Sequence, residues 1–461
     1  MKGIDINIFT KRIFQKLSYA HFLTDYSSID YIYPPVYAWN KISHELFLKQ
    51  YMPEIVLDRP YLLYIHFPFC SKKCLFCRQY SLIPSDKQLY AKYENAIIKE
   101  IIFYARYLKN SKIIGIYCGG GTPTLFPLSN IIKTVKRNFL TLPAFSINVE
   151  STLESLSESK LLELKDMGTT RLLIGIQTLD AKVLANINRS PQNKHMLEKT
   201  IHFCRSIGMD CINVELIAGL PGQTKESFLG DLKVVVDLGV DSIHCYPLLI
   251  TPLTGLWENA MKKKPIWPSL RAEEMWQAGA RFLQNNRYNY KGDDFSLRDN
   301  ARNPLYTTFT RGSMWGGVVG LGVSAVSHFA GKGKTRFSCI NTLDIEKYFE
   351  NIRNSFFSIE KGYILDEEET LRQYLIKACR YNELNIDNLQ SRLGGELGIE
   401  NVKKLFKREF KCFEKTGKVC YDNRKKIMRF STDNWFESSK CFFSRKVLDE
   451  CKQKMKQMHI D

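Results

Sequence analysis

Short apolar runs that are rich in β-branched residues alternate with longer amphipathic stretches through the middle of the chain. Stretches with helical periodicity, such as 92–108 and 194–208, lie between these runs. The pattern predicts strands that run parallel, with helices crossing over between them. We therefore expect an α/β fold of six β/α units, whose parallel sheet is either open or curled into a partial barrel. The six runs lie at 61–67, 113–118, 145–150, 171–177, 211–220 and 242–250.

Unusual residues stand within or directly after five of the six predicted strands. A loop rich in cysteine follows the first run, and the glycine run GGGTPT (119–124) follows the second. Glu150 closes the third run, Gln177 closes the fourth, and Glu215 lies within the fifth. In barrels of parallel strands, active-site residues gather at the carboxyl ends of the strands. The sequence therefore predicts a functional site at this edge of the sheet.

Three of the 13 cysteines, Cys70, Cys74 and Cys77, stand in a CxxxCxxC spacing. A structural zinc site needs four ligands, commonly in two separated pairs, and this loop has neither a histidine nor a second cysteine pair nearby. Three thiolates on one tight loop suit a [4Fe–4S] cube with one iron left open for another ligand. Zinc and a chance cluster of cysteines are the alternatives.

Composition excludes several classes of protein. A hydrophobic fraction of 44% is ample for a large core and argues against disorder. The chain has no signal-like opening and no run of about 18 apolar residues, so we expect a cytoplasmic protein without a membrane span. The net charge is +18, and residues 401–461 carry 17 Lys and Arg against 8 Asp and Glu. A basic segment of this kind attracts polyanions, although a solvated helical face is the simpler interpretation.

The motifs together resemble a known family. The CxxxCxxC spacing, with Phe76 before its last cysteine, is similar to the radical S-adenosylmethionine (SAM) superfamily. Five segments, in order, resemble its oxygen-independent coproporphyrinogen III dehydrogenase family, which also includes haem chaperones, anaerobic haem-opening enzymes and class C radical SAM methyltransferases. The resemblance covers roughly residues 55–380. The five segments are YIHFPFC (64–70), GGGTPT (119–124), LIGIQTLD (173–180), VELIAGLPGQT (214–224) and GLGVSAVS (320–327).

The resemblance implies cofactors and the residues that bind them. Cys70, Cys74 and Cys77 would hold the [4Fe–4S] cluster, and its open iron would bind SAM, which is cleaved to a 5′-deoxyadenosyl radical. Glu215 stands where the family commonly has aspartate. A second SAM would lie near a glycine-rich loop that corresponds to Gly322, Val323 and Ser324. No catalytic residue is implied. The residues implied to contact the first SAM are Tyr64, Gly119, Gly120, Gly121, Thr122, Glu150, Gln177, Arg189 and Glu215.

Three functions are open under this resemblance. We favour class C-type methyl or one-carbon transfer, or rearrangement, on a large aromatic or tetrapyrrole substrate. The second is oxidative decarboxylation of coproporphyrinogen III, although that enzyme usually has a further cysteine where this chain has Gln79. The third is a non-catalytic haem-binding chaperone. Those proteins usually begin almost at the strand before the cysteine loop, whereas this chain has about 60 residues before that strand.

Partners and domains follow from the same resemblance. We expect an anionic tetrapyrrole as the small-molecule substrate, an electron donor such as flavodoxin or ferredoxin, anaerobic activity and no binding of nucleic acid. A helix at 367–380 and a basic hairpin about Asp422-Asn423 favour a winged-helix-like module. The expected domains are an N-terminal extension (1–57), the radical SAM partial barrel (58–255), a connecting region with the glycine-rich loop (256–364) and a basic, mainly helical, winged-helix-like domain (365–461).

Overall fold

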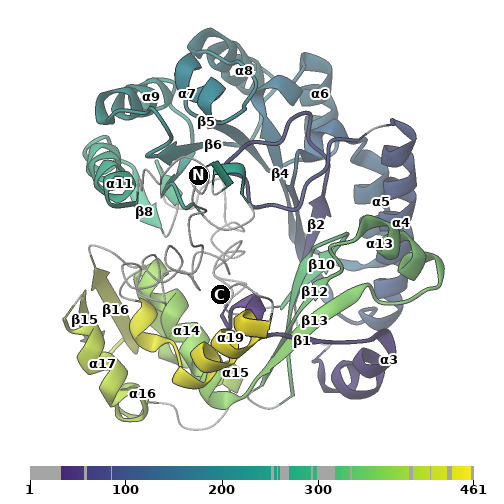
Figure 1. Ribbon diagram of the computed structural model, residues 1–461, viewed down its shortest axis with the longest axis vertical. Helices are drawn as coiled ribbons and strands as arrows, with labels where there is room; N and C mark the ends of the chain where they lie inside the picture. Colours follow the sequence, from purple (N-terminus) through teal and green to yellow (C-terminus); the bar gives the residue numbers. More distant parts are fainter. Residues whose placement is uncertain are drawn as a thin grey trace, which may run out of the picture. The chain divides into compact units, whose positions relative to one another are not determined.

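The computed structural model divides into two units, which we call the large unit and the small unit (Figure 1). The large unit takes in residues 56–329 and 340–360, and the small unit takes in residues 1–55, 330–339 and 361–461. The structure describes residues 33–56, 60–84, 86–250, 254–256, 258–259, 269–291, 294–297, 317–332, 335–393, 398–415, 417–432 and 439–457.

The six predicted strands of the large unit are confirmed, and they run parallel in sequence order. A seventh parallel strand, β10 (Gly317–Leu321), pairs with β2 and places Val318 opposite Leu62. The sequence pattern did not predict this strand. The six strands are β2 (Tyr61–Phe67), β3 (Lys112–Gly120), β4 (Leu140–Thr152), β5 (Arg171–Gln177), β6 (Cys211–Ala218) and β7 (Ser242–Pro247).

Antiparallel strands flank this parallel run. On one side β11 (Val326–Ala330) pairs with β10, and on the other β9 (Asp294–Ser296) pairs with β7 and with β8 (Asn289–Lys291). Arg171 on β5 is fully buried, and its Nη2 lies 3.1 Å from Asp294 Oδ2, so this ion pair ties β9 to the sheet. The described strands form an open sheet, as expected for a partial barrel.

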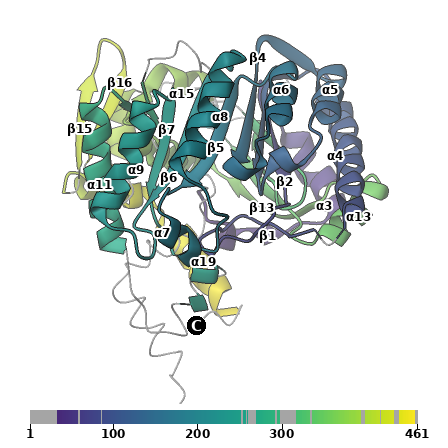
Figure 2. The same ribbon diagram turned by 90° about the horizontal axis from the view of Figure 1, so that it is seen from above.

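Helices cover the outer side of the parallel strands and stand side by side there (Figures 1 and 2). Three of them are preceded by the N-cap residues Ser157, Asn193 and Thr224, whose side chains accept hydrogen bonds from amides of the first turn. No helix in the described part of the chain is long and apolar enough to cross a lipid bilayer. The helices are α4 (Gln88–Tyr107), α5 (Ser129–Asn138), α6 (Glu158–Asp166), α7 (Ala181–Asn186), α8 (Lys194–Ser206), α9 (Lys225–Asp237) and α11 (Ser269–Asn285).

The core of the large unit lies along the parallel strands. Every residue of β5 is buried, and eight consecutive residues of β3 are buried as well. Near-continuous apolar strands of this kind are typical of parallel sheets that are covered on both faces. One apolar cluster joins Leu62, Ile114, Leu173 and Val318 from four strands.

The small unit contains the element order of a winged helix. Helix α14 (Glu367–Tyr381) is followed by a strand, three short helices and a hairpin, and the three strands pair antiparallel in the order β14-β16-β15. This order agrees with the winged-helix-like module that the sequence predicts, whereas the expected domain boundaries stay predictions. The other elements are β14 (Glu383–Asn385), α15 (Ile386–Leu393), α16 (Ile399–Leu405), α17 (Lys407–Phe413), β15 (Gly417–Asp422), β16 (Ile427–Thr432), the 3-10 helix η6 (Lys440–Phe442) and α19 (Arg445–Gln457).

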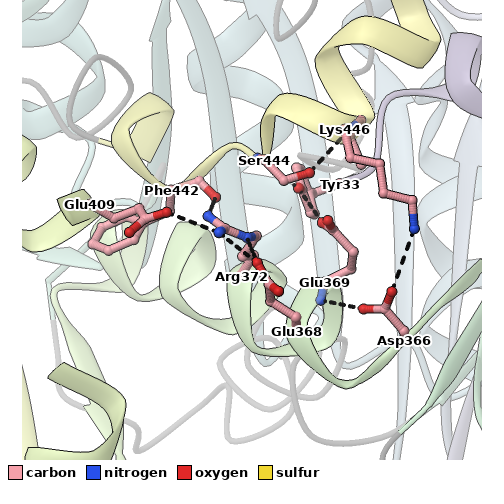
Figure 3. Close-up of polar contacts among 10 residues, drawn as sticks. Tyr33, Asp366, Glu368, Glu369, Arg372, Glu409, Phe442, Ser444 and Lys446 are labelled. Atoms are coloured by element: carbon pink, nitrogen blue, oxygen red, sulfur yellow. Dashed lines mark hydrogen bonds and ion pairs between the residues drawn. The ribbon is translucent and has the colours of Figure 1, made fainter. Parts of the chain in front are cut away.

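A buried polar network joins distant segments of the small unit (Figure 3). The Tyr33 hydroxyl donates to Glu369 on α14, and the amide of Ser444 donates to the Tyr33 oxygen at 3.1 Å. Arg372, one turn further along α14, donates to the carbonyl of Phe442 at 3.2 Å. Residues far apart in the sequence are therefore held at one helix.

Glu100 on α4 is buried within the large unit with only 1% of its surface exposed. The amide of Gly322 and the hydroxyl of Tyr348 each donate to its Oε2 at 2.7 Å, and Asn341 Nδ2 donates to its Oε1 at 3.2 Å. Burial raises the pKa of Glu100 to about 7, although these hydrogen bonds oppose the shift. The folded chain therefore favours the protonated carboxyl.

This carboxyl predicts how stability depends on pH. Because the pKa of Glu100 is higher in the folded chain than in the unfolded chain, its contribution to the free energy of unfolding falls as pH rises toward and through about 7. Through this group, the free energy of unfolding of the wild type should fall by about 1 kcal/mol between about pH 6 and about pH 8. Glu100→Gln should lack this decrease, and urea unfolding at both pH values measures the difference. Glu346→Gln, at an exposed carboxylate on α13 (Ile345–Arg353), is the control for loss of one charge. An unchanged pH dependence in Glu100→Gln would contradict the assignment.

Candidate active site

The cysteine loop joins β2 to α4, and backbone hydrogen bonds close its base. The amide of Cys70 donates to the Leu82 carbonyl at 3.0 Å, and the amide of Leu82 donates to the Pro68 carbonyl at 2.6 Å. A turn in which the Cys77 amide donates to the Cys74 carbonyl at 3.1 Å brings the last two cysteines together. The three thiols are thereby held on one closed loop.

The tip of this loop is anchored to segments that follow α7 and β7. The Leu75 amide donates to the Ile187 carbonyl at 3.0 Å, and the Leu256 amide donates to the Leu75 carbonyl at 2.8 Å. The side chains of Leu75 and Phe76 pack against an apolar cluster that includes Leu248, which follows β7. The loop thus reaches from the end of β2 to the end of β7.

Polar groups from other loops approach two of the thiols. The Thr122 hydroxyl donates to Cys70 Sγ at 3.7 Å, and Arg189 Nη1 donates to Cys74 Sγ at 3.5 Å. Burial raises the pKa of the Cys77 thiol to about 11, although the nearby Lys73 ammonium opposes this shift. Donors and cations next to sulfur stabilise thiolates, which are the form that binds metal.

These cysteines fit an iron–sulfur cube better than a single ion. All three are free thiols and none is fully buried. In the described part of the chain, no three His, Cys, Asp or Glu side chains gather around one point where a single metal ion could sit. In a [4Fe–4S] cube each thiolate binds a different iron, so the sulfurs need not meet at one point. The loop therefore fits a cluster with three protein ligands.

The glycine run lies against the start of the cysteine loop. The Gly121 amide donates to the Phe67 carbonyl at 2.6 Å, and the Thr122 amide donates to the Phe69 carbonyl at 2.8 Å. A Cβ at position 121 would lie 2.6 Å from the Phe69 oxygen and 2.8 Å from the Phe67 oxygen. Only glycine permits this close approach of two backbones.

Tyr64 and Glu150 meet beside Gly119. A Cβ on Gly119 would lie 3.1 Å from the Tyr64 ring and 3.2 Å from the Glu150 carboxyl carbon. The Tyr117 hydroxyl donates to Glu150 Oε1 at 2.7 Å, and the Gly120 amide donates to Oε2 at 3.1 Å. Tyr117 was not predicted as a site residue, yet it fixes the orientation of the Glu150 carboxylate, which was predicted.

His66 orients the Tyr64 hydroxyl. Burial lowers the pKa of His66 to about 4, so the imidazole is neutral near pH 7. Its Nε2 lies 2.8 Å from the Tyr80 carbonyl, which can only accept, and therefore Nε2 carries the proton. Its Nδ1 must then accept, and the Tyr64 hydroxyl donates to it at 3.1 Å.

Gln177, Arg189 and Glu215 gather around Gly175. A Cβ on Gly175 would lie 2.9 Å from Gln177 Nε2 and 3.5 Å from both Arg189 Nη2 and Glu215 Oε2. Gln177 ends β5 with φ of 64°, a left-handed backbone that costs a residue with a side chain about 1–3 kcal/mol. Among the described residues, its buried Oε1 and the buried Nε of Arg189 have no hydrogen-bond partner. Buried polar groups that lack partners at this edge of the sheet fit a bound polar ligand such as SAM.

Comparison with known proteins identifies this part of the chain. Residues 64–235, which include the cysteine loop, the glycine run and every residue gathered around Gly119 and Gly175, match the family model described as the Radical SAM superfamily. The chain contains a radical SAM domain.

The radical SAM domain has curated relatives that extend well beyond it. The oxygen-independent coproporphyrinogen III oxidase of Escherichia coli is 26% identical over 339 residues, which are 70% of this chain and 72% of the relative. The enzyme of the same name from Helicobacter pylori is 26% identical over 79% of this chain and 81% of its own length. The heme chaperone HemW of Buchnera aphidicola is 31% identical, but over only 44% of this chain and 54% of its own length.

A solved structure confirms the fold. The structure described as coproporphyrinogen III oxidase (HemN) from Escherichia coli, a radical SAM enzyme, superposes with a TM-score of 0.74. The superposition covers 89% of this chain and 96% of that chain, at 23% sequence identity. The α/β architecture expected from the sequence is therefore the fold of a known radical SAM enzyme.

Two further polar residues lie at this edge of the sheet, on β7, and sequence reasoning missed them. His244 Nδ1 on β7 lies 3.2 Å from Glu215 Oε1, and the two residues are opposite each other in the register of β6 and β7. Burial raises the pKa of Tyr246 well above its usual value, and the nearby carboxylates of Glu215 and Glu150 raise it further. Both residues lie in the predicted run 242–250, whose alternation of polar residues could have pointed to them.

The glycine-rich loop lies in the turn that joins β10 to β11. The amides of Gly322 and Val323 donate to Glu100 and to the Tyr93 hydroxyl, and the amide of Ser324 donates to the Thr342 carbonyl at 2.8 Å. These hydrogen bonds do not join the loop to the groups at Gly119 or Gly175. The second SAM, and the roles assigned to the other residues, stay predictions.

Removal of one thiol should prevent cluster loading. We expect Cys74→Ala, reconstituted with iron and sulfide under nitrogen, to lose most of its bound iron and acid-labile sulfide, because the cube then has only two protein ligands. Cys420→Ala, at an exposed thiol on β15, is the control and should load as the wild type does. The assignment of the cluster ligands fails if Cys74→Ala retains full iron.

A methyl group at position 121 should disturb the junction of the two loops. Neither carbonyl near the added Cβ can retreat without losing its hydrogen bond to the glycine run, so Gly121→Ala should lower the free energy of unfolding by about 1–3 kcal/mol. Gly230→Ala on α9, where nothing lies within 4 Å of the added Cβ, should leave stability unchanged or raise it. Chemical denaturation of both variants tests the difference, and equal stability would contradict the close packing described above.

Proposed function

We propose that this chain is a SAM-cleaving enzyme that removes a hydrogen atom from a porphyrinogen-type substrate, as an oxygen-independent coproporphyrinogen III oxidase. The observation that carries the proposal is the junction of a three-thiol loop with a polar cradle at one edge of a radical SAM domain. Curated oxidases with similarity over 70–79% of the chain support the substrate class.

Each part of the cradle has a chemical task in this proposal. Cys70, Cys74 and Cys77 hold the cluster. When bound, the cluster and SAM supply a carbon radical that can take hydrogen from an unactivated carbon. Glu150, which Tyr117 and the glycine run hold in place, accepts hydrogen bonds from the methionyl ammonium group of SAM.

The side chains around Gly175 bind the rest of SAM. Gln177 and Arg189 offer polar atoms that lack partners among the described residues, and Glu215 offers a carboxylate that His244 orients. Arg189 also donates to Cys74, so one guanidinium links the cofactor pocket to the cluster loop. Leu75 and Phe76 of the cysteine loop pack apolar side chains against this edge of the sheet. Apolar surroundings favour the exclusion of water, and a reactive radical requires that exclusion.

A haem carrier is the second candidate, and two observations favour it. Gln79 stands where the oxidase family usually has a further cysteine, and its buried Oε1 has no hydrogen-bond partner among the described residues. The most similar of the relatives reported above, in identity, is the heme chaperone HemW. Methyl transfer, which the sequence analysis favoured, stays a prediction, because the curated relatives reported above are oxidases and a heme chaperone.

Product analysis separates these functions. We expect the anaerobically reconstituted chain, given SAM, a strong reductant and coproporphyrinogen III, to release 5′-deoxyadenosine and CO₂ in step. Mass spectrometry of nucleosides and headspace gas checks this outcome, with Cys74→Ala as the inactive control. If 5′-deoxyadenosine appears together with S-adenosylhomocysteine, the proposed decarboxylation is wrong and the chain transfers methyl groups. If the chain binds haem tightly and releases neither nucleoside, the proposed decarboxylation is wrong and the chain is a haem carrier.

Tyr117 should act as a positioning residue for SAM. Tyr117→Phe removes a hydrogen bond to an ionised carboxylate, which is worth about 1.5–3 kcal/mol, so the Kd for SAM should rise about 10- to 100-fold. Calorimetric titration of the cluster-loaded variant measures this change. Tyr107→Phe, at a partly exposed tyrosine near the end of α4, is the control and should bind SAM as the wild type does. Equal affinities in the two variants would remove Tyr117 from the proposal.

A further inference from the structure

Two cysteines of the small unit approach each other closely, far from any cysteine motif in the sequence. Cys412 lies on α17 and Cys441 lies on η6, and their sulfur atoms are 2.9 Å apart. We propose that Cys412 and Cys441 form a redox-active dithiol, a modification site that a two-electron oxidant converts reversibly to a disulfide. The proposal is independent of the function of the radical SAM domain.

Aromatic packing holds the two backbone segments together. The Phe442 ring, next to Cys441, lies with its centroid 5.3 Å from that of Phe410 and 5.9 Å from that of Phe413. These two phenylalanines flank Cys412 on α17, and Phe442 is fully buried. Both cysteines are therefore attached to one side of a packed aromatic cluster, and their separation is set by the core of the small unit.

One buried guanidinium reinforces this arrangement (Figure 3). Arg372 Nη2 donates to Glu409 on α17 at 2.9 Å, and its Nη1 donates to the Phe442 carbonyl on η6 at 3.2 Å. A third contact joins Nη2 to Glu368 at 2.7 Å and fixes the arginine on α14. Arg372 therefore binds both α17, which carries Cys412, and η6, which carries Cys441. This contact positions the two thiols for a bond before they react.

Exposure distinguishes this pair from the other thiols around it. Cys412 is exposed and Cys441 is partly exposed, so a small oxidant can reach them. Cys379 on α14 is fully buried, and burial raises the pKa of its thiol, with the nearby Cys441 adding to the shift. A buried thiol with a raised pKa reacts slowly. Cys420 on β15 is exposed and makes a matched single-thiol control.

The chemistry of the pair balances with hydrogen peroxide as the oxidant. One thiol loses its proton and, as the thiolate, attacks a peroxide oxygen; the O–O bond breaks, and the leaving hydroxide takes up that proton to become water. The second thiol then attacks the sulfenic acid sulfur, and a second water leaves as the S–S bond forms. The two sulfurs need to move only about 0.9 Å closer to reach a bond length of about 2.05 Å. A dithiol such as dithiothreitol reverses the reaction by thiol–disulfide exchange.

The bond would join the winged-helix-like module to the segment that leads into α19. It would close a loop from α17 through the β15–β16 hairpin to η6, across a sequence separation of 29 residues. Cross-links of this kind stabilise a folded chain mainly by restricting the unfolded chain. We therefore expect the oxidised form to have a higher Tm than the reduced form.

Peptide mapping of the full-length chain tests the dithiol. The reduced protein, with its cluster loaded, is treated with hydrogen peroxide, blocked with iodoacetamide, digested and analysed by mass spectrometry. We expect a linked pair of peptides containing Cys412 and Cys441, a loss of two hydrogens, reversal by dithiothreitol and a rise in Tm. Cys420 should remain available to iodoacetamide under conditions that close the pair.

Two variants make the result decisive. Cys441→Ser should abolish the linked peptides and the rise in Tm, and should leave Cys412 as available to iodoacetamide as Cys420. Cys420→Ser should leave the linkage intact. The proposal is overturned if wild-type Cys412 and Cys420 stay equally available after peroxide, or if Cys412 links to a cysteine other than Cys441.

Discussion

Two backbone hydrogen bonds join the glycine run to the start of the cysteine loop, and the site depends on them. Gly121 and Thr122 donate to the carbonyls of Phe67 and Phe69, which directly precede the first cysteine of the loop. The contact requires a residue without a side chain at position 121. Because the run begins at the end of β3 and the loop at the end of β2, this junction ties the thiols to the parallel sheet, and the sheet positions every other group.

Parallel pairing then brings the remaining groups to the same edge. β4 ends near Glu150, β5 ends at Gln177, and the register of β6 with β7 sets Glu215 opposite His244. A carboxylate that is partly buried in such a site needs donors, and Tyr117 and the Gly120 amide provide them for Glu150. The fold thus holds two sets of polar side chains in place, one around Gly119 and one around Gly175.

Much of this arrangement could be read from local sequence patterns, and the remainder could not. Six strands have apolar runs, and residues at their ends converge because parallel strands share a polarity. β10 was missed because its pairing with β2 joins residues about 250 positions apart, and its glycines suggest a loop. Tyr117 and the Cys412–Cys441 pair depend in the same way on the register of strands or on packing, which no local spacing encodes.

The central claim is that Cys70, Cys74 and Cys77 hold a four-iron cluster with one iron that is not bound by protein. Mössbauer spectroscopy of ⁵⁷Fe-reconstituted protein, with and without SAM, tests it most directly. We predict that SAM shifts the signal of one iron in four and leaves the other three unchanged. Four irons that do not respond to SAM, or a protein that retains zinc in place of iron, would contradict this account.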